Sequence, residues 1–168
     1  MEFFQLNDQV IGSSFSIGED NSILKWNINT NQANKWLDLD SYAVDHDWVP
    51  NNKGASDLLA VGFADGSFKL YNKNGKVEKN ASDAHKKSII SLKWSYDGGA
   101  LATASQDGSL KIWSKNGSLR TNLIQSDRAI YSVCWSPDSD AILYCFDKSI
   151  SIKPMSANQQ KQLTWKAH

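Results

Sequence analysis

The chain carries little that would indicate a secreted, membrane-embedded or strongly charged protein. It has 18 basic and 18 acidic residues, so its formal net charge is zero and nothing points to a nucleic-acid or membrane surface. No stretch approaches the roughly 18 apolar residues that a membrane-spanning helix needs. Residues 1–8 are too few and too acidic for a signal peptide. These features favour a cytoplasmic protein that neither binds nucleic acid nor inserts into a membrane.

Cysteine is also scarce, with Cys134 and Cys145 as the pair present. Both fall on neighbouring predicted strands. If the hairpin between them turns near residues 137–140, Cys134 faces Leu143 and Cys145 lies one diagonal away. Diagonal partners are usually too far apart to form a disulfide. We therefore expect two reduced thiols, as is usual in the cytosol.

What the chain does have is a repeat. Residues 65–77 return as residues 107–119 with seven of the thirteen positions identical, and weaker copies begin at Asp20 and Asp147. The first residues of the four copies are separated by 45, 42 and 40 positions. A second motif, centred on tryptophan, recurs 46 and 41 residues apart at Trp48, Trp94 and Trp135. A period of about 40–45 residues is typical of β-propellers with four strands per blade.

The third unit shows the four strands most clearly. β-branched, aromatic and alternating apolar residues predict strands, and Asp-Gly and Asn-Gly pairs predict tight hairpins. The predicted strands are residues 89–94, 100–105, 109–113 and 119–124, with hairpin turns at Asp107-Gly108 and Asn116-Gly117. With 40% hydrophobic and 11% aromatic residues the chain can fill a core, and the tryptophans on the repeat are interpreted as packing residues between blades.

These motifs resemble the WD-repeat family, whose blades contain a tetrad of histidine, serine or threonine, aspartate and tryptophan. In the third unit the positions of this tetrad fall on His85, Thr103, Asp107 and Trp113. A carboxylate that is buried in a turn must be paired. A histidine that is itself held by a hydroxyl group and an indole N–H supplies such a partner. We therefore expect a structural network at these four residues.

The other units match the tetrad in part. The first has Ser16, Asp20 and Trp26 but no histidine. The second has Asp65 and Tyr71, with Val61 at the hydroxyl position. The fourth keeps Asp147, with Leu143 and Lys153 at the remaining positions. We do not expect the full network in these three units.

A narrower resemblance extends from about Ser16 to the C-terminus. Short runs such as Tyr131–Trp135 and 165–168 are similar to the N-terminal propeller of a tandem-propeller WD-repeat subunit of intraflagellar transport complex B. This resemblance implies a non-enzymatic scaffold that is needed for cilium assembly and ciliary cargo transport. It implies other subunits of that complex as partners, and the cilium and its base as the location. A WD-repeat adaptor of a vesicle coat or a ubiquitin ligase, and a propeller enzyme, are the alternatives.

The expected fold is an all-β, partial WD-repeat propeller of about four blades. WD propellers commonly have seven blades, and closing the ring removes exposed sheet edges. The chain is therefore interpreted as a fragment of a longer protein, or as a short product whose missing blades come from a partner. The expected division is blade 1 at 1–40 (incomplete), blade 2 at 41–83, blade 3 at 84–126, blade 4 at 127–163 and the start of blade 5 at 164–168.

No catalytic, metal or cofactor site is predicted. Asp45, His46 and Asp47 have the side chains of metal ligands, but on a strand 45 and 47 face one side and 46 the other, so we interpret them as a solvated strand edge. Residues 51–56 lengthen one loop of the second blade and are a candidate contact site. Several lysines are interpreted as a solvated surface, because they are spread over different strands and turns: Lys69, Lys73, Lys76, Lys79, Lys86 and Lys87.

Overall fold

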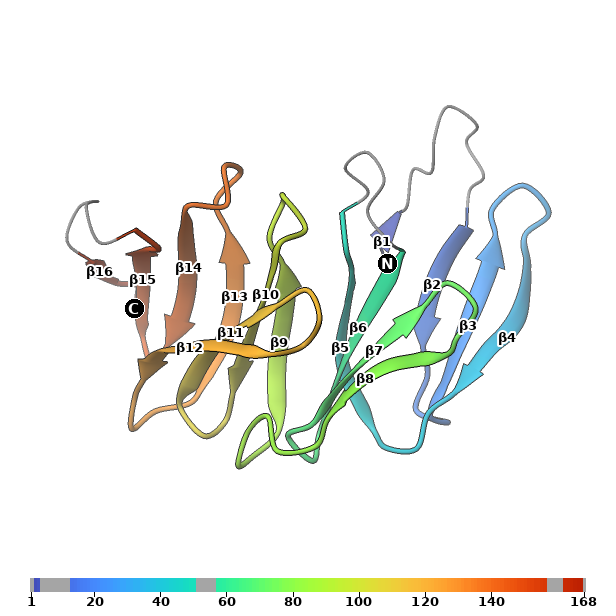
Figure 1. Ribbon diagram of the computed structural model, residues 1–168, viewed down its shortest axis with the longest axis horizontal. Helices are drawn as coiled ribbons and strands as arrows, with labels where there is room; N and C mark the ends of the chain where they lie inside the picture. The colour runs from blue at the N-terminus through green and yellow to red at the C-terminus, as the bar shows by residue number, and fades with distance from the viewer. Residues whose placement is uncertain (1, 4–12, 51–56, 157–161, 168) are drawn as a thin grey trace. The chain divides into compact units, whose positions relative to one another are not determined.

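The computed structural model describes residues 2–3, 13–50, 57–156 and 162–167, and every helix or strand assigned within these ranges is a β-strand. Sixteen strands form four sheets of four, and in each sheet the strands lie side by side in sequence order (Figure 1). The all-β class expected from the sequence is confirmed. The loop at residues 51–56, named above as a candidate contact site, lies outside the described residues.

The strand bounds are as follows. The first sheet contains β1 (Glu2–Phe3), β2 (Ser13–Ile17), β3 (Ser22–Asn27) and β4 (Gln32–Asp38). The second contains β5 (Ala43–Trp48), β6 (Leu58–Phe63), β7 (Phe68–Asn72) and β8 (Val77–Ala81). The third contains β9 (Ile89–Trp94), β10 (Ala100–Ser105), β11 (Ser109–Ser114) and β12 (Leu119–Gln125). The fourth contains β13 (Ile130–Trp135), β14 (Ala141–Phe146), β15 (Ser149–Pro154) and β16 (Leu163–Lys166).

The chain divides into two compact units, Met1–Ala43 and Val44–His168. The first unit holds the sheet of β1–β4. The second unit holds the other three sheets, apart from Ala43 at the start of β5.

The strands predicted for the third sheet agree with the structure to within a residue or two. Two details of the expected division are wrong. Residues 164–168 were expected to begin a fifth blade, but β16 pairs with β15, with Ile150 opposite Trp165, so it completes the fourth sheet. The first blade was expected to be incomplete, but its sheet has four strands because β1 pairs with β2 over two residues.

The second strands of two sheets are buried along their whole length. All six residues of β6 and all six of β10 are buried, which explains why both sequences are apolar or small without alternation. Two hydrophobic clusters fill the space around them. The first includes Leu58, Ala60, Phe68, Leu70, Ile89, Leu92, Trp94, Leu101 and Trp113. The second includes Ala102, Ala104, Leu110, Ile112, Ile130, Val133, Trp135, Ile142 and Tyr144.

Gly62 lies at a close contact between the second and third sheets. A Cβ atom at this position would lie 2.6 Å from Leu92 Cδ2 and 2.8 Å from Ile89 Cγ2. Glycine in the middle of a strand weakens it, but here the absence of a side chain lets β6 approach the core residues of β9. The two sheets therefore share one core rather than two separate ones.

The cysteine geometry is as predicted. Cys134 pairs with Leu143 in the β13–β14 register, Cys145 pairs with Ser132, and both thiols are free. Within the described residues we find no helix with the length and apolar character to cross a bilayer.

Candidate functional site

The interior of the third sheet contains a polar network. His85 lies in the segment between β8 and β9, Thr103 in β10, Asp107 in the β10–β11 turn and Trp113 in β11. Thr103 is fully buried, and His85 and Trp113 are each 6% exposed. Strand pairing sets Thr103 opposite Lys111 and Leu101 opposite Trp113, so Thr103 and Trp113 are diagonal neighbours. The four residues predicted from the sequence therefore lie on four different segments that the fold brings together.

Hydrogen bonds join these side chains in a line. Trp113 Nε1 donates to Thr103 Oγ1 at 2.8 Å, and Thr103 Oγ1 lies 2.7 Å from His85 Nε2. On the other side of the ring, His85 Nδ1 lies 2.8 Å from Ser109 Oγ, which donates to Asp107 Oδ1 at 2.6 Å. His85 Nδ1 is 3.5 Å from Asp107 Oδ2, so Ser109 is inserted between the histidine and the aspartate.

The direction of these bonds assigns the histidine tautomer. Because the Ser109 hydroxyl donates its hydrogen to Asp107, its oxygen accepts from His85 Nδ1–H. His85 Nε2 is then the acceptor and takes the hydrogen of the Thr103 hydroxyl, whose oxygen accepts from Trp113. Each donor is used once, and the chain of bonds ends at a carboxylate. The network is fully satisfied with a neutral imidazole.

The charge states agree with this assignment. Burial, together with the positive charge of Lys111, lowers the pKa of His85 from 6.5 to about 4, although Asp107 acts in the opposite direction. Burial would raise the pKa of Asp107, but hydrogen bonds from Ser109 and from the backbone N–H of Lys86 lower it to about 2. At neutral pH the network therefore holds one negative charge, at Asp107.

Ser109 is the member that the sequence analysis missed. The sequence feature that could have indicated Ser109 is the Asp-x-Ser pattern, which recurs in the first two sheets. Asp20 accepts from the N–H of Ser22 at 3.2 Å and from its hydroxyl at 2.9 Å. Asp65 accepts from the same two groups of Ser67 at 2.8 and 2.6 Å. The serine two residues after the aspartate thus closes each of these turns.

The partial tetrads of the first two sheets give different outcomes. In the first sheet Trp26 Nε1 donates to Ser16 Oγ at 2.9 Å, which repeats the Trp113–Thr103 bond without a histidine. In the second sheet Val61 and Tyr71 are both buried, and the hydroxyl group of Thr103 has no counterpart at Val61.

Asp147 does not occupy the position of Asp107. β14 ends at Phe146 and β15 begins at Ser149, so the turn has two residues, whereas three separate Ser105 from Ser109. Asp147 is exposed and has a positive φ of 48°, which such a short turn requires. Asp147 thus lies in a turn that is one residue shorter than the turn of Asp107, and its assignment as a partial tetrad residue stays a prediction.

The turn glycines contact the segment that leads to the next sheet. Gly66 and Gly108 have φ of 88° and 79°. The carbonyl group of Gly66 accepts from the N–H of His85 at 3.0 Å, and that of Gly108 accepts from the N–H of Ser126 at 2.8 Å. A Cβ on either glycine would collide with a backbone carbonyl of the same segment. These turns therefore fix where each connecting segment begins.

The acidic residues of β5 bind the edge of the third sheet. The N–H of Leu92 donates to Asp45 Oδ2 at 2.9 Å, and the N–H of Trp94 donates to Asp47 Oδ2 at 2.6 Å. β9 is the edge strand of its sheet, so these N–H groups have no strand partner on that side. The interpretation of Asp45 and Asp47 as a solvated edge is therefore wrong, because their carboxylates accept hydrogen bonds from the edge strand of the neighbouring sheet. Within the described ranges, no cluster of three or more potential metal ligands occurs.

The repeating tryptophans link successive first strands. Trp94 Nε1 donates to the carbonyl group of Asp47 at 3.2 Å, and Trp135 Nε1 donates to that of Lys93 at 3.0 Å. In both cases the acceptor is the residue before the tryptophan of the preceding sheet, Trp48 or Trp94. The second repeat marker of the sequence is thus a link between β5, β9 and β13.

The lysines that were interpreted as a solvated surface are distributed over several elements. Lys73 and Lys76 are exposed in the β7–β8 turn, and Lys86 and Lys87 are exposed before β9. Lys69 in β7 is half-buried, with Nζ 5.8 Å from the centre of the Phe63 ring. Lys79 in β8 is also half-buried and lines a groove.

Four-stranded sheets that repeat every 40–46 residues, with Asp-Gly turns and a His–Ser–Asp network, define the class of WD-repeat β-propeller blades. The family model described as the anaphase-promoting complex subunit 4 WD40 domain matches residues 47–138, which is more than half of the chain, and the chain belongs to this family of WD40 domains.

Two curated relatives match over a longer stretch. They are the Intraflagellar transport protein 80 homologs of Mus musculus and Rattus norvegicus, each 39% identical over 161 residues. The match covers 92% of this chain and 20% of each relative, so the chain spans about a fifth of their length. The resemblance to an intraflagellar transport protein that the sequence indicated is confirmed by these matches.

Proposed function

We propose that the chain is a non-enzymatic interaction platform of the intraflagellar transport machinery, located in the cytoplasm, in the cilium and at its base. Other subunits of intraflagellar transport complex B are its proposed partners, and its role is in cilium assembly and cargo transport. The observation that carries the proposal is the 39% identity to the Intraflagellar transport protein 80 homologs over 92% of this chain.

The way the polar side chains are used supports a non-enzymatic role. His85 is buried, has a lowered pKa and uses both ring nitrogens in hydrogen bonds within the sheet, so it is unavailable as a general base for a substrate. Asp45 and Asp47 bind backbone N–H groups of β9. These three side chains thus stabilise the blades, which supports a function carried by the surface that the blades present.

The test is affinity purification of the full-length protein that contains this chain. The protein is tagged at its own locus in ciliated cells, and the co-purifying proteins are identified by mass spectrometry. We expect intraflagellar transport subunits in the eluate and the tag in cilia. Untagged cells processed in parallel are the control. A protein that purifies without any such subunit and is absent from cilia contradicts the proposal.

A second candidate is an adaptor of a ubiquitin ligase. The match of residues 47–138 to the anaphase-promoting complex subunit 4 WD40 domain favours it. The same purification separates the two candidates, because this function requires ligase subunits among the co-purifying proteins. The transport function is preferred because the match to the relatives covers 92% of the chain.

A further inference from the structure

A groove lies between the second and third sheets, on the side of their last strands. It has a volume of about 570 Å³ and is lined by Leu58 and Leu70 together with residues of β8 and of the β11–β12 turn. This volume is within the range of about 300–1,000 Å³ that is usual for ligand pockets. Four of the remaining lining side chains are Asn72, Glu78, Lys79 and Lys115, yet most of the open surface is apolar. The groove therefore has a mostly apolar open surface and a polar rim, although Leu58 and Leu70 themselves are 8% and 1% exposed.

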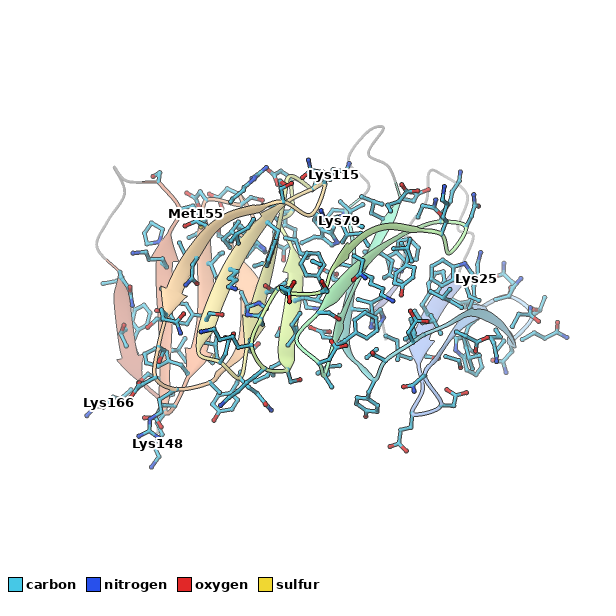
Figure 2. The ribbon with its side chains drawn as sticks, turned by 60° about the horizontal axis from the view of Figure 1, so that its bottom comes forward. Lys25, Lys79, Lys115, Lys148, Met155 and Lys166 are labelled. Carbon is cyan, nitrogen blue, oxygen red and sulfur yellow. The ribbon has the colours of Figure 1, made fainter. Side chains whose placement is uncertain are left out.

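Lys79 and Lys115 form the basic part of this rim. Lys79 comes from β8, and Lys115 from the turn that follows β11. Both side chains are half-buried, and neither ammonium group forms an ion pair or a hydrogen bond within the described part of the chain. Figure 2 shows them at the same edge of the second unit, whereas Lys148 and Lys166 lie at another place. Two cations without a partner at one rim favour an anionic ligand.

The acidic residue of the rim does not neutralise these lysines. Glu78 Oε1 instead accepts a hydrogen bond from Asn72 Nδ2 at 2.6 Å. The stem of Lys79 is held by close packing, since a Cβ at Gly117 would lie 2.5 Å from Lys79 Cγ. The rim therefore has an excess of positive charge, because it contains two lysines and one glutamate.

We propose that this groove binds an extended acidic peptide segment of a partner protein. A carboxylate of the peptide binds Lys79 and Lys115, and a neighbouring apolar side chain covers the apolar surface of the groove. This apolar surface favours a peptide over a bare anion, because an anion alone leaves that surface in contact with water. The inference rests on the proposed scaffold function, since it identifies where one partner binds. It does not depend on which pathway the partner belongs to.

The test measures binding of a short fluorescein-labelled peptide of glutamate, aspartate and leucine to the purified full chain by fluorescence anisotropy. A matched peptide carries glutamine and asparagine in place of the acids. We expect the acidic peptide alone to bind, and the double variant Lys79→Gln, Lys115→Gln to bind it about fivefold to tenfold more weakly. The control variant Lys148→Gln, Lys166→Gln should bind as the wild type does.

Several results overturn the inference. These are failure of the wild type to bind at millimolar peptide, equal binding of the amide peptide, and equal weakening in the control variant. Displacement of the peptide by equimolar inorganic phosphate also overturns it, because the site then recognises an anion alone. If the groove variant does not fold, carbodiimide cross-linking of the wild type decides the matter. Links to Lys79 or Lys115 support the groove, and links solely to other lysines refute it. A negative result here leaves the outcome of the ciliary purification unaffected.

Discussion

Trp94 is bound twice to Asp47, a residue of the preceding sheet. Its backbone N–H donates to the Asp47 carboxylate at 2.6 Å, and its indole Nε1 donates to the Asp47 carbonyl group at 3.2 Å. The carboxylate therefore satisfies an edge N–H group that would otherwise have no protein partner. One acidic residue thus connects two sheets, through a bond between residues that are 47 positions apart along the chain.

The first prediction concerns this link. Asp47→Ala removes the acceptor of the Trp94 N–H and should lower the free energy of unfolding by about 1–3 kcal/mol. The measurement is chemical denaturation followed by tryptophan fluorescence. Asp138→Ala, at an exposed turn residue, is the control and should change stability by less than about 0.5 kcal/mol. Equal stability of the two variants would show that the edge bond contributes nothing.

The second prediction tests the buried hydroxyl group of Thr103. Thr103→Val keeps the shape of the side chain but leaves Trp113 Nε1 and His85 Nε2 without their shared partner, so we expect a loss of about 2–4 kcal/mol. Thr103→Ser keeps the oxygen and should retain most of the stability. Val61 provides the converse control, because Val61→Thr places a hydroxyl in a sheet without a histidine and should not stabilise it. A valine variant as stable as the wild type would refute a stabilising role for the network.

The fold and the site differ in how far the sequence determines them. β9 and β10 were predicted at their observed bounds because short runs of apolar, β-branched and aromatic residues that end in turn residues such as Asp-Gly are local signals. The insertion of Ser109 between His85 and Asp107 was not predicted, because it depends on the side-chain geometry of a turn. Asp147 was assigned by counting repeat spacing, which cannot reveal that its turn is one residue shorter than that of Asp107.

The contacts of Asp45 and Asp47 escaped prediction for another reason. Alternation along a strand correctly placed both side chains on one face, but the N–H groups they meet belong to a different sheet. Contacts between sheets depend on how the sheets stack, and no local pattern encodes that. The repeating tryptophans could be recognised in the sequence because they recur at a fixed period. Their hydrogen-bond acceptors could not be predicted, because these are backbone carbonyl groups, which every residue carries.

The third prediction concerns pH. The pKa of His85 is about 4 in the folded chain and near 6.5 when unfolded. Because the unfolded chain binds a proton that the folded chain does not, the free energy of unfolding should fall as the pH drops from about 6.5 to 4. The full effect is on the order of 3 kcal/mol. Asp107, with its pKa lowered to about 2, adds a further loss below about pH 4.

The measurement for this third prediction is a series of denaturant titrations between about pH 7 and 4. His85→Gln should be less stable than the wild type at neutral pH but lose less stability on acidification, because the buried titrating group is gone. His46→Gln controls for the loss of a histidine elsewhere in the second unit. Parallel pH profiles for the wild type and the His85 variant would contradict the assignment of a buried neutral imidazole.

The last prediction separates two reasons for glycine in the Asp-Gly turns. Gly108 and Gly98 have φ of 79° and 67°, so alanine at either position costs about 1–2 kcal/mol in backbone strain. A Cβ at Gly108 would also collide with the carbonyl groups of Ser126 and Arg128, whereas the nearest atom to a Cβ at Gly98 is Val49 Cγ2, at 3.1 Å. Gly108→Ala should therefore lower the melting temperature clearly more than Gly98→Ala, as measured by differential scanning calorimetry. If both variants melt at the same temperature, the strained backbone alone explains the glycine, and the contact between this turn and the segment leading to the fourth sheet adds nothing to stability.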